Sequence, residues 1–258
     1  MSTRMSDHEF PRIYAHRGAS SLAPENTMGS FVKAMEVGAR RIEFDVDIMG
    51  DGTLLIIHDQ TLDRTTDGRG GYYDLGYSDL RRLDAGKWFS PTYRFERIPE
   101  LADVVEFLNR YPHMGGNLEI KPCLGGARLR EQLVDAVAAA VDALDGARSR
   151  LLVSSFDHDA LARFHAARPA IDLGWLFART GQPGPDWRSG APELGCRAIH
   201  PDDQGLTEAE VAAMLDAGFE VNVWTVDDLD RARELARWGV TGIFTNRPQD
   251  FPASALER

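Results

Sequence analysis

Residues 13–47 read IYAHRGASSLAPENTMGSFVKAMEVGARRIEFDVD. The stretch contains two short apolar runs that end in polar residues, Ile13–His16 and Ile42–Asp47, and we interpret both as strands. Between them, Thr27–Val37 has helical periodicity and follows Asn26, a residue type that often caps a helix. A strand, a helix and a second strand in this order predict a parallel βαβ unit.

The same alternation continues through the rest of the chain. Six further apolar runs have the length of strands: Leu118–Lys121, Leu151–Ser154, Leu173–Phe177, Ala198–His200, Glu220–Thr225 and Gly242–Thr245. Helical periodicity is clearest in Leu129–Leu144, Thr207–Ala217 and Asp227–Trp238. Eight strands alternating with helices in 258 residues predict an α/β fold of the closed (β/α)8 TIM barrel class. An open doubly wound sheet is the alternative, although no GxGxxG motif follows the first strand.

We interpret residues 1–258 as one barrel domain that carries an insertion at 59–99. This segment has no strand–helix unit of ordinary length, although connections in such folds are usually about 2–6 residues long. It contains the Gly- and aromatic-rich runs RTTDGRGGYYDLG (64–76) and AGKWFSPTYRF (85–95). The aromatic side chains of the insertion either form a small core of their own or overhang the site: Tyr72, Tyr73, Trp88, Phe89 and Tyr93.

Composition and charge exclude several classes of protein. A chain of 258 residues with 43% hydrophobic residues is neither a disordered tail nor a small disulfide scaffold. The net charge of −11 and the lack of a long basic run argue against nucleic acid and anionic membrane partners. The sequence has no apolar leader and no stretch long enough to be a membrane anchor, and Cys123 and Cys196 form no CxxC motif. We therefore expect a cytoplasmic protein, whose oligomeric state the sequence leaves open.

Polar side chains end the first three predicted barrel strands, and the carboxyl ends of barrel strands are where barrel enzymes carry their chemistry. These residues are His16, Arg17, Glu43, Asp45, Glu119 and Lys121. Glu43 and Asp45 are two residues apart and share one face of their strand, as do Glu119 and Lys121. Three carboxylates at one barrel mouth would repel one another, and a divalent cation would remove the repulsion. Oxygen ligands favour Mg²⁺, Ca²⁺ or Mn²⁺ over Zn²⁺.

The Asp-Gly pair at residues 51–52 predicts a two-residue hairpin between the strand-like runs 43–49 and 53–59. That register places Asp45 opposite His58, so that both side chains face the same side of the hairpin. A slip of one residue would reverse the face. Under the two-residue register, His58 joins the carboxylates at the barrel mouth.

The charge of this group indicates what it binds. Three carboxylates, one divalent cation, Arg17 and Lys121 leave one positive charge, which a singly charged phosphodiester would neutralise. His16 and His58 would supply groups that titrate near neutral pH. Simpler alternatives exist: Glu43 and Asp45 as ion-pair partners, His16 as a core histidine, and Glu119 with Lys121 as a self-neutralising pair. His200 also ends a strand and is a further candidate for substrate contact.

Several motifs together resemble the glycerophosphodiester phosphodiesterase family. They are AHRGASSLAPENTMGSF (15–31), IEFDVDIMGDGTLLIIHD (42–59), LDRTTDGRG (62–70), LEIKP (118–122), VNVWTV (221–226) and GIFTNRP (242–248). The resemblance runs from about Pro11 to Pro248. The runs RLDAGKWFSPTY (82–93) and LGCRAIHP (194–201) are similar to the cytosolic bacterial type. The resemblance implies a (β/α)8 barrel with a small insertion after its second strand.

The resemblance also implies an activity and roles for individual residues. The enzyme would hydrolyse a glycerophosphodiester, its small-molecule substrate, to sn-glycerol 3-phosphate and an alcohol. The implied residue roles are His16 and His58 as acid and base, Glu43, Asp45 and Glu119 as ligands of one divalent cation (Mg²⁺ first, Ca²⁺ or Mn²⁺ next), Arg17 and Lys121 as phosphate contacts, and Trp224 as an aromatic wall against the glycerol. By similarity to phosphatidylinositol-specific phospholipases C, His16 would be the base and His58 the acid. The nucleophile is water or the substrate's own 2-hydroxyl.

The chain departs from the family pattern at a few positions. Asn246 stands where the family usually has Asp, Asp227 where it often has Asn, and Glu100 where it usually has Thr. Asp47 occupies a position that is often neutral or basic, and we expect it to lie behind the site or at the surface. None of these departures is expected to touch the catalytic set. Asp47 and Glu100 could alter metal affinity or head-group choice.

Other functions remain open from the sequence alone. A lysophospholipase D-type activity on lipid substrates would need an apolar rim or an anchor, and the sequence has no anchor. A non-catalytic barrel that only binds phosphodiesters would be expected to lack a histidine or a metal ligand, and a metal-dependent barrel isomerase would not need two histidines and a phosphate clamp. The leaving alcohol is not specified by any motif.

Overall fold

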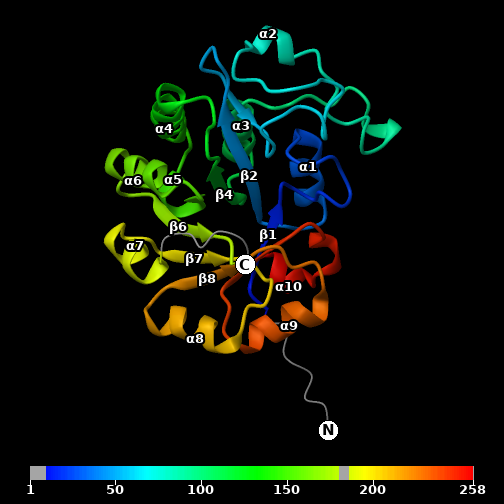
Figure 1. The fold of residues 1–258 in the computed structure, drawn as a ribbon. Coiled ribbons are helices and arrows are strands. Elements are labelled where there is room, and N and C mark those ends of the chain that lie inside the picture. The colour runs from blue at the N-terminus through cyan, green and yellow to red at the C-terminus, as the bar shows by residue number, and fades with distance from the viewer. Residues whose placement is uncertain (1–9, 180–185, 258) are drawn as a thin grey trace.

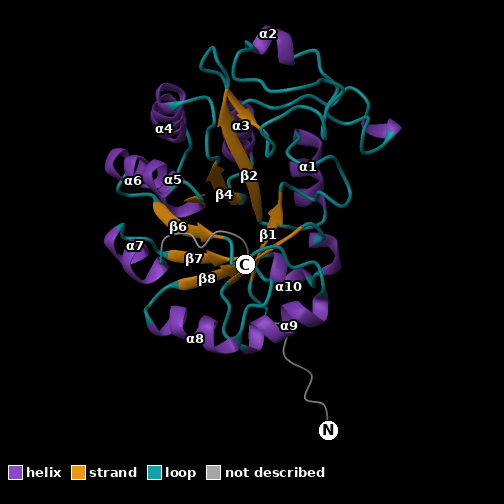
Figure 2. Ribbon diagram, in the orientation of Figure 1, coloured by secondary structure: helices purple, strands orange, loops and turns teal. Residues whose placement is uncertain are grey.

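The computed structural model describes residues 10–179 and 186–257, and within them eight parallel strands form a closed barrel. In chain order these strands are β1 (Arg12–His16), β2 (Arg41–Ile48), β4 (Gly115–Ile120), β5 (Leu151–Ser155), β6 (Asp172–Phe177), β7 (Ala198–Pro201), β8 (Glu220–Val223) and β9 (Gly242–Thr245). Each pairs with the next, and β1 also pairs with β9, which closes the ring (Figures 1 and 2). The predicted TIM barrel is confirmed.

Helices surround this ring (Figure 2). The longer ones are α1 (Met28–Glu36), α3 (Leu101–Arg110), α4 (Ala127–Val141), α6 (His158–Ala167), α7 (Trp187–Glu193), α8 (Glu208–Asp216) and α9 (Leu229–Arg237). Shorter helical turns are α2 (Tyr77–Leu80), η2 (Pro91–Tyr93), α5 (Ala147–Arg150), η3 (Pro248–Asp250) and α10 (Ala253–Leu256). No helix in the described ranges combines the length and the apolar character that crossing a membrane requires.

The first helix begins one residue later than the sequence suggested. Thr27, not Asn26, is the N-cap of α1, because its hydroxyl accepts a hydrogen bond from the Ser30 N–H at 3.2 Å. Asn26 instead adopts a left-handed backbone, with φ of 55°, and its amide group donates to Asp45 at 2.8 Å. The residue predicted to cap the helix therefore belongs to the barrel mouth.

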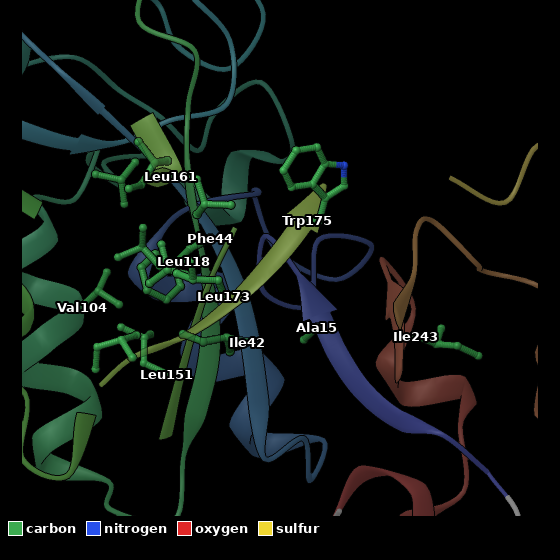
Figure 3. Close-up of a cluster of buried hydrophobic side chains, with 14 of the residues drawn as sticks. Ala15, Ile42, Phe44, Val104, Leu118, Leu151, Leu161, Leu173, Trp175 and Ile243 are labelled. Atoms are coloured by element: carbon green, nitrogen blue, oxygen red, sulfur yellow. The ribbon is translucent and has the colours of Figure 1, made fainter. Parts of the chain in front are cut away.

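Alternation along the strands separates the core from the site. The even-numbered residues of β2, 42–48, are apolar and belong to the main buried cluster, whereas its odd-numbered residues 43–47 are acidic and lie on the other face of the strand. Figure 3 shows the strand residues Phe44, Leu118 and Leu173 beside Val104 of α3 and Leu161 of α6. Packing of helices against strands thus holds the barrel together, and the other strand faces carry both polar side chains such as Glu43 and apolar ones such as Phe244.

The hairpin after β2 has a different register from the one predicted. The antiparallel strand β3 (Leu54–Ile56) pairs Val46 with Ile56, and the Met49 N–H donates to the Thr53 carbonyl at 2.9 Å. The loop therefore has three residues, 50–52, because Gly52 takes a left-handed backbone with φ of 95° but Asp51 does not, as a two-residue type I′ turn would require. The predicted pairing of Asp45 with His58 is wrong by one residue, since it is the Ile57 N–H that donates to the Asp45 carbonyl, at 3.1 Å. His58 lies beyond this last ladder bond and still lines the mouth.

Residues 59–99, which include α2, lie beside the barrel, at the top of Figure 1. Side chains from the hairpin after β2 (residues 49–57) and from this segment form a second apolar cluster: Met49, Leu55, Ile57, Leu62, Tyr72, Leu80, Ala85 and Ile98. Trp88, Phe89 and Tyr93 pack edge to face against one another, with ring centroids 5.8 and 5.6 Å apart. These aromatic side chains therefore serve the packing of the segment itself.

Candidate active site

His16 is the last residue of β1 and is held through Nδ1. Its Nδ1 lies 2.8 Å from the Asn246 Oδ1. The Asn246 amide nitrogen donates to Asp227 at 2.8 Å, so its oxygen is the atom that faces the histidine. Nδ1 therefore carries the proton, and Nε2, 3.9 Å from Glu43, is left as an acceptor. The expectation that the departures at 246 and 227 leave the catalytic set untouched is wrong, because Asn246 contacts His16 directly.

The residues after β1 turn back toward the carboxylates. Arg17 has a left-handed backbone, with φ of 56°, and its N–H donates to Glu43 at 3.0 Å. Its side chain donates to Glu25 at 2.8 Å and lies 3.4 Å from Asp45. A Cβ on Gly18 would lie 2.3 Å from the Ser30 hydroxyl oxygen, so only glycine allows this close turn. The tight turn thus presents both a backbone donor and a guanidinium to the site.

Glu43, Asp45 and Glu119 converge at the mouth. They come from the adjacent strands β2 and β4, and one oxygen from each carboxylate lies within 4.8 Å of the others. All three side chains are buried. Lys121 lies against two of them, with Nζ 3.1 Å from Asp45 and 2.6 Å from Glu119. The structure brings together the three residues that the sequence singled out as metal ligands.

The electrostatics of this cluster suit a cation. Burial, together with the charge of Asp45, raises the pKa of Glu43 well above its usual range. Burial also raises the pKa of Glu119, although Lys121 opposes the shift. Burial acts in the same direction on Asp45, but Lys121 and Arg17 prevail and hold its pKa below the usual range. A divalent ion among these oxygens would stabilise the ionised form of all three, so the residues present fit such an ion.

His58 is held by a different kind of partner. Its Nδ1 lies 2.7 Å from the carboxylate of Asp59, which in turn accepts from Arg64 at 2.6 and 2.9 Å. Arg64 also donates twice to Glu25, at 2.7 and 2.8 Å, and Glu25 accepts from Arg17. Arg64 is the main reason that the pKa of Asp59 falls to about 2. This chain of ion pairs joins Arg17, which follows His16, to Asp59, which follows His58.

A cavity of about 50 Å³, which we call the mouth cavity, opens between the two histidines. Its polar wall includes Glu43, Glu119 and Arg17, and its apolar wall includes Phe156, Leu176, Trp224 and Phe244. The indole N–H of Trp224 donates to the His200 carbonyl at 3.0 Å, and its ring meets Phe156 edge to face. No described residue of the segment 59–99 lines this cavity.

Three further residues line the mouth cavity: His200, which the sequence singled out as a candidate for substrate contact, Asn117 and Ser154. His200 is fully buried, and burial lowers its pKa to about 3. Asn117 was not predicted at all; it donates to Ser154 at 2.9 Å, and its side-chain oxygen has no hydrogen-bond partner among the described residues. Asp47 is buried and accepts from Tyr72 and Tyr73 at 2.7 and 2.6 Å, so it is not at the surface.

The chain is similar to known proteins over nearly its whole length. Residues 16–250 match the model of a family described as glycerophosphoryl diester phosphodiesterase. A glycerophosphodiester phosphodiesterase of Caldanaerobacter subterraneus is 33% identical over 237 residues, covering 92% of this chain and 94% of that protein. A protein of the same description from Bacillus altitudinis is 34% identical, covering 95% and 97%.

Solved structures that resemble this chain are also phosphodiesterases. An Oleispira antarctica phosphodiesterase in complex with the product sn-glycerol-3-phosphate superposes with a TM-score of 0.87 at 34% identity, covering 95% of this chain and 96% of that chain. A glycerophosphodiester phosphodiesterase from Agrobacterium tumefaciens gives a TM-score of 0.75 at 28% identity, covering 93% and 98%. Fold and sequence therefore agree on the same relatives.

Proposed function

The chain belongs to the glycerophosphoryl diester phosphodiesterase family and is an enzyme of that class, and on this premise we propose how its mouth cavity works. The proposed reaction is metal-dependent hydrolysis of a glycerophosphodiester to sn-glycerol 3-phosphate and an alcohol. The observation that carries the proposal is the meeting of three buried carboxylates with two histidines, each anchored through Nδ1.

We propose Glu43, Asp45 and Glu119 as the ligands of one divalent cation, with Mg²⁺ as the first candidate. Such an ion, when bound, polarises the phosphoryl oxygens and offsets the negative charge that develops on them. Arg17 lines the cavity, and Lys121 lies behind it against two of the carboxylates. We assign both residues to the phosphate as sources of positive charge, and Trp224 to the glycerol as an apolar wall.

We assign one proton transfer to each histidine: His16 accepts a proton and His58 donates one. His16 has its proton on Nδ1 and a free acceptor at Nε2, and burial with the nearby Arg17 lowers its pKa to about 4. It therefore stays neutral at pH 7 and accepts the proton of the attacking hydroxyl. The carboxylate of Asp59 holds His58 through Nδ1, and we assign to His58 the donation of a proton to the departing alkoxide. The attacking group is water or the glycerol 2-hydroxyl, and a cyclic phosphate intermediate would identify the second.

Product release with and without chelator tests this proposal. We expect removal of divalent cations to reduce the release of glycerol 3-phosphate to background, and Mg²⁺, Mn²⁺ or Ca²⁺ to restore it. Glu43→Gln should lose both activity and metal binding, whereas Glu106→Gln, on the exposed face of α3, should lose neither. Full turnover in a metal-free preparation would contradict the proposed metal site.

The same assay, run on a panel of substrates, separates the other candidate functions. Faster cleavage of lysophospholipids than of water-soluble glycerophosphodiesters would favour a lysophospholipase D-type activity. Tight binding of a glycerophosphodiester without cleavage, in the presence of each metal, would favour a barrel that only binds. We expect neither result, because both histidines and all three carboxylates are in place.

A further inference from the structure

A larger cavity lies at the opposite end of the barrel from the mouth. It has a volume of about 230 Å³ and is lined by residues at the amino ends of the strands. Arg12 and Arg41 begin β1 and β2, Asp172 and Glu220 begin β6 and β8, and Arg197 directly precedes β7. We call this the floor cavity. An adjoining hollow of about 440 Å³ shares three of its arginines, so the floor is open to solvent.

The floor cavity is strongly basic. Six guanidinium groups among the described residues line it, and only two carboxylates do, which leaves an excess of four positive charges. The arginines are Arg12, Arg40, Arg41, Arg148, Arg150 and Arg197. The whole chain has a net charge of −11, so this concentration runs against the overall balance. A concave basic site on an acidic protein focuses its field on small anions.

The two carboxylates of the floor cavity are already used by two of its arginines. Arg12 lies 2.9 Å from Glu220, and Arg197 lies 2.5 Å from Asp172 and 2.7 Å from Glu220. Arg150 donates to main-chain carbonyl groups, among them those of Met114 at 2.9 Å and Asp145 at 2.8 Å. These carbonyls satisfy its N–H groups but carry no net charge, so the cation of Arg150 is not neutralised.

Arg40 and Arg148 add further positive charge to the floor cavity. Within residues 10–179 and 186–257, no carboxylate forms an ion pair with Arg40, Arg148 or Arg150. Burial lowers the pKa of Arg41, and the neighbouring Arg12 adds to this shift, although Tyr14 and Glu220 oppose it. Like charges held together at partial burial are costly, and an anion bound among them would relieve that cost.

We propose that the floor cavity binds a small phosphate anion, either inorganic phosphate or a phosphate monoester. Guanidinium groups present paired donors that match phosphate oxygens, and several of them together suit a dianion better than a monocarboxylate. The volume is below that of pockets for drug-sized ligands, which are about 300–1,000 Å³. The small concave volume fits a small molecule rather than the extended backbone of a nucleic acid. This inference does not depend on the proposed catalytic roles.

Calorimetric titration of the full-length protein with inorganic phosphate, methyl phosphate and acetate tests the floor cavity. Three proteins are compared: the wild type, Arg40→Gln/Arg148→Gln, and the matched control Arg82→Gln/Arg237→Gln, which removes two exposed arginines elsewhere. The mouth cavity is intact in all three, so a difference between them reports on the floor. Whichever of the two phosphate anions binds more tightly identifies the physiological class of ligand.

We expect the floor variant to bind phosphate at least tenfold more weakly than the wild type, and the control to stay within about twofold. Phosphate should also raise the melting temperature of the wild type and of the control more than that of the floor variant. Hydrolytic activity should be equal in all three proteins. Arg148→Gln alone, at an exposed position, should also weaken phosphate binding, but by less than the double variant does. This single variant replaces the double variant in the test if the latter fails to fold. Equal phosphate affinity in the floor variant and the control would overturn the proposal, as would tighter binding of acetate than of phosphate.

Discussion

His16 and His58 lie on opposite sides of the mouth cavity, and their surroundings differ in charge. His16 is the more buried, with 15% of its side chain exposed, and its Nδ1 faces the neutral amide of Asn246. The side chain of His58 is 34% exposed, and its Nδ1 faces the carboxylate of Asp59. Burial, beside a neutral partner, favours the free base of His16, whose pKa is lowered to about 4. We propose opposite proton transfers for these two side chains, with His16 as the base and His58 as the acid.

The two histidines also differ in what holds them. His16 ends a barrel strand, and its backbone position follows from the strand ladder. His58 lies beyond the hairpin and is positioned by Asp59, Arg64 and Glu25 through successive ion pairs. The proposed base is therefore part of the barrel ladder, while the proposed acid is held by side chains outside it. Perturbing each histidine and its partner separately shows whether this division holds.

The largest expected effect is the loss of either histidine. His16→Ala and His58→Ala should each lower kcat on a glycerophosphocholine-type substrate by about 10²–10⁴, the usual range for a general acid or base. Metal affinity should change little, since neither imidazole is among the proposed ligands. His113→Ala, at an exposed position, is the matched control and should be silent. A variant that kept more than about a tenth of the wild-type rate would exclude its histidine from proton transfer.

Exchange of the partner of His16 should move the pH–rate profile. Asn246→Asp places an anion next to His16 and raises its pKa, so the acidic limb of kcat/KM should shift to higher pH, where a larger fraction of the base is protonated and inactive. Asp59→Asn removes the carboxylate that holds Nδ1 of His58 and should lower kcat about tenfold without moving the acidic limb. A shift of the acidic limb to lower pH in Asn246→Asp, or any shift of that limb in Asp59→Asn, would contradict the assigned roles.

Removal of Arg64, which links Asp59 to Glu25, should have a smaller effect on turnover. Arg64→Gln breaks the contacts with Asp59 and Glu25 and should lower kcat severalfold with little change in KM, because the acid is less well positioned. Arg69→Gln removes an 83% exposed arginine of the same segment and should have no effect. A change confined to KM would instead place Arg64 in substrate binding.

The smallest effect concerns stability rather than turnover. His200 is buried near the mouth, and its pKa is lowered to about 3, so the folded state binds fewer protons than the unfolded state between that pH and the usual His value. The free energy of unfolding should therefore fall as the pH drops below about 6.5, by up to about 1.4 kcal/mol per pH unit from this group. His200→Gln should flatten that part of the stability curve. Denaturant titrations at pH 7, 6 and 5 would detect the difference, and parallel curves for both proteins would contradict it.

The sequence predicted the barrel because strand and helix periods repeat along the chain and depend mainly on local pattern. All eight parallel strands lie where apolar runs indicated, and the carboxylates are neighbours because β2 and β4 are adjacent and parallel. The hairpin register was missed because only Gly52, and not Asp51, takes the left-handed backbone that a two-residue turn requires at both positions. One wrong register nevertheless led to the right location for His58, since that residue lies outside the ladder.

Side-chain partners could not be predicted in the same way. Asn246 is 230 residues from His16, and the bond between them depends on the closure of β1 against β9. The ring of His158 stacks on Trp175 with centroids 3.6 Å apart, and its Nε2 lies 3.0 Å from the Leu176 carbonyl. Long-range contacts of this kind follow from tertiary packing, which no local pattern encodes.

The dependence of each histidine variant on the leaving group tests the division of roles most directly. kcat/KM is measured for the wild type, His16→Ala and His58→Ala with an alkyl leaving alcohol and with a p-nitrophenyl leaving group, which departs without protonation. The account predicts that the defect of His58→Ala shrinks by at least tenfold on the p-nitrophenyl substrate, while the defect of His16→Ala stays the same. Recovery of His16→Ala instead, or an unchanged defect in His58→Ala, would contradict the assignment of His16 as the base and His58 as the acid.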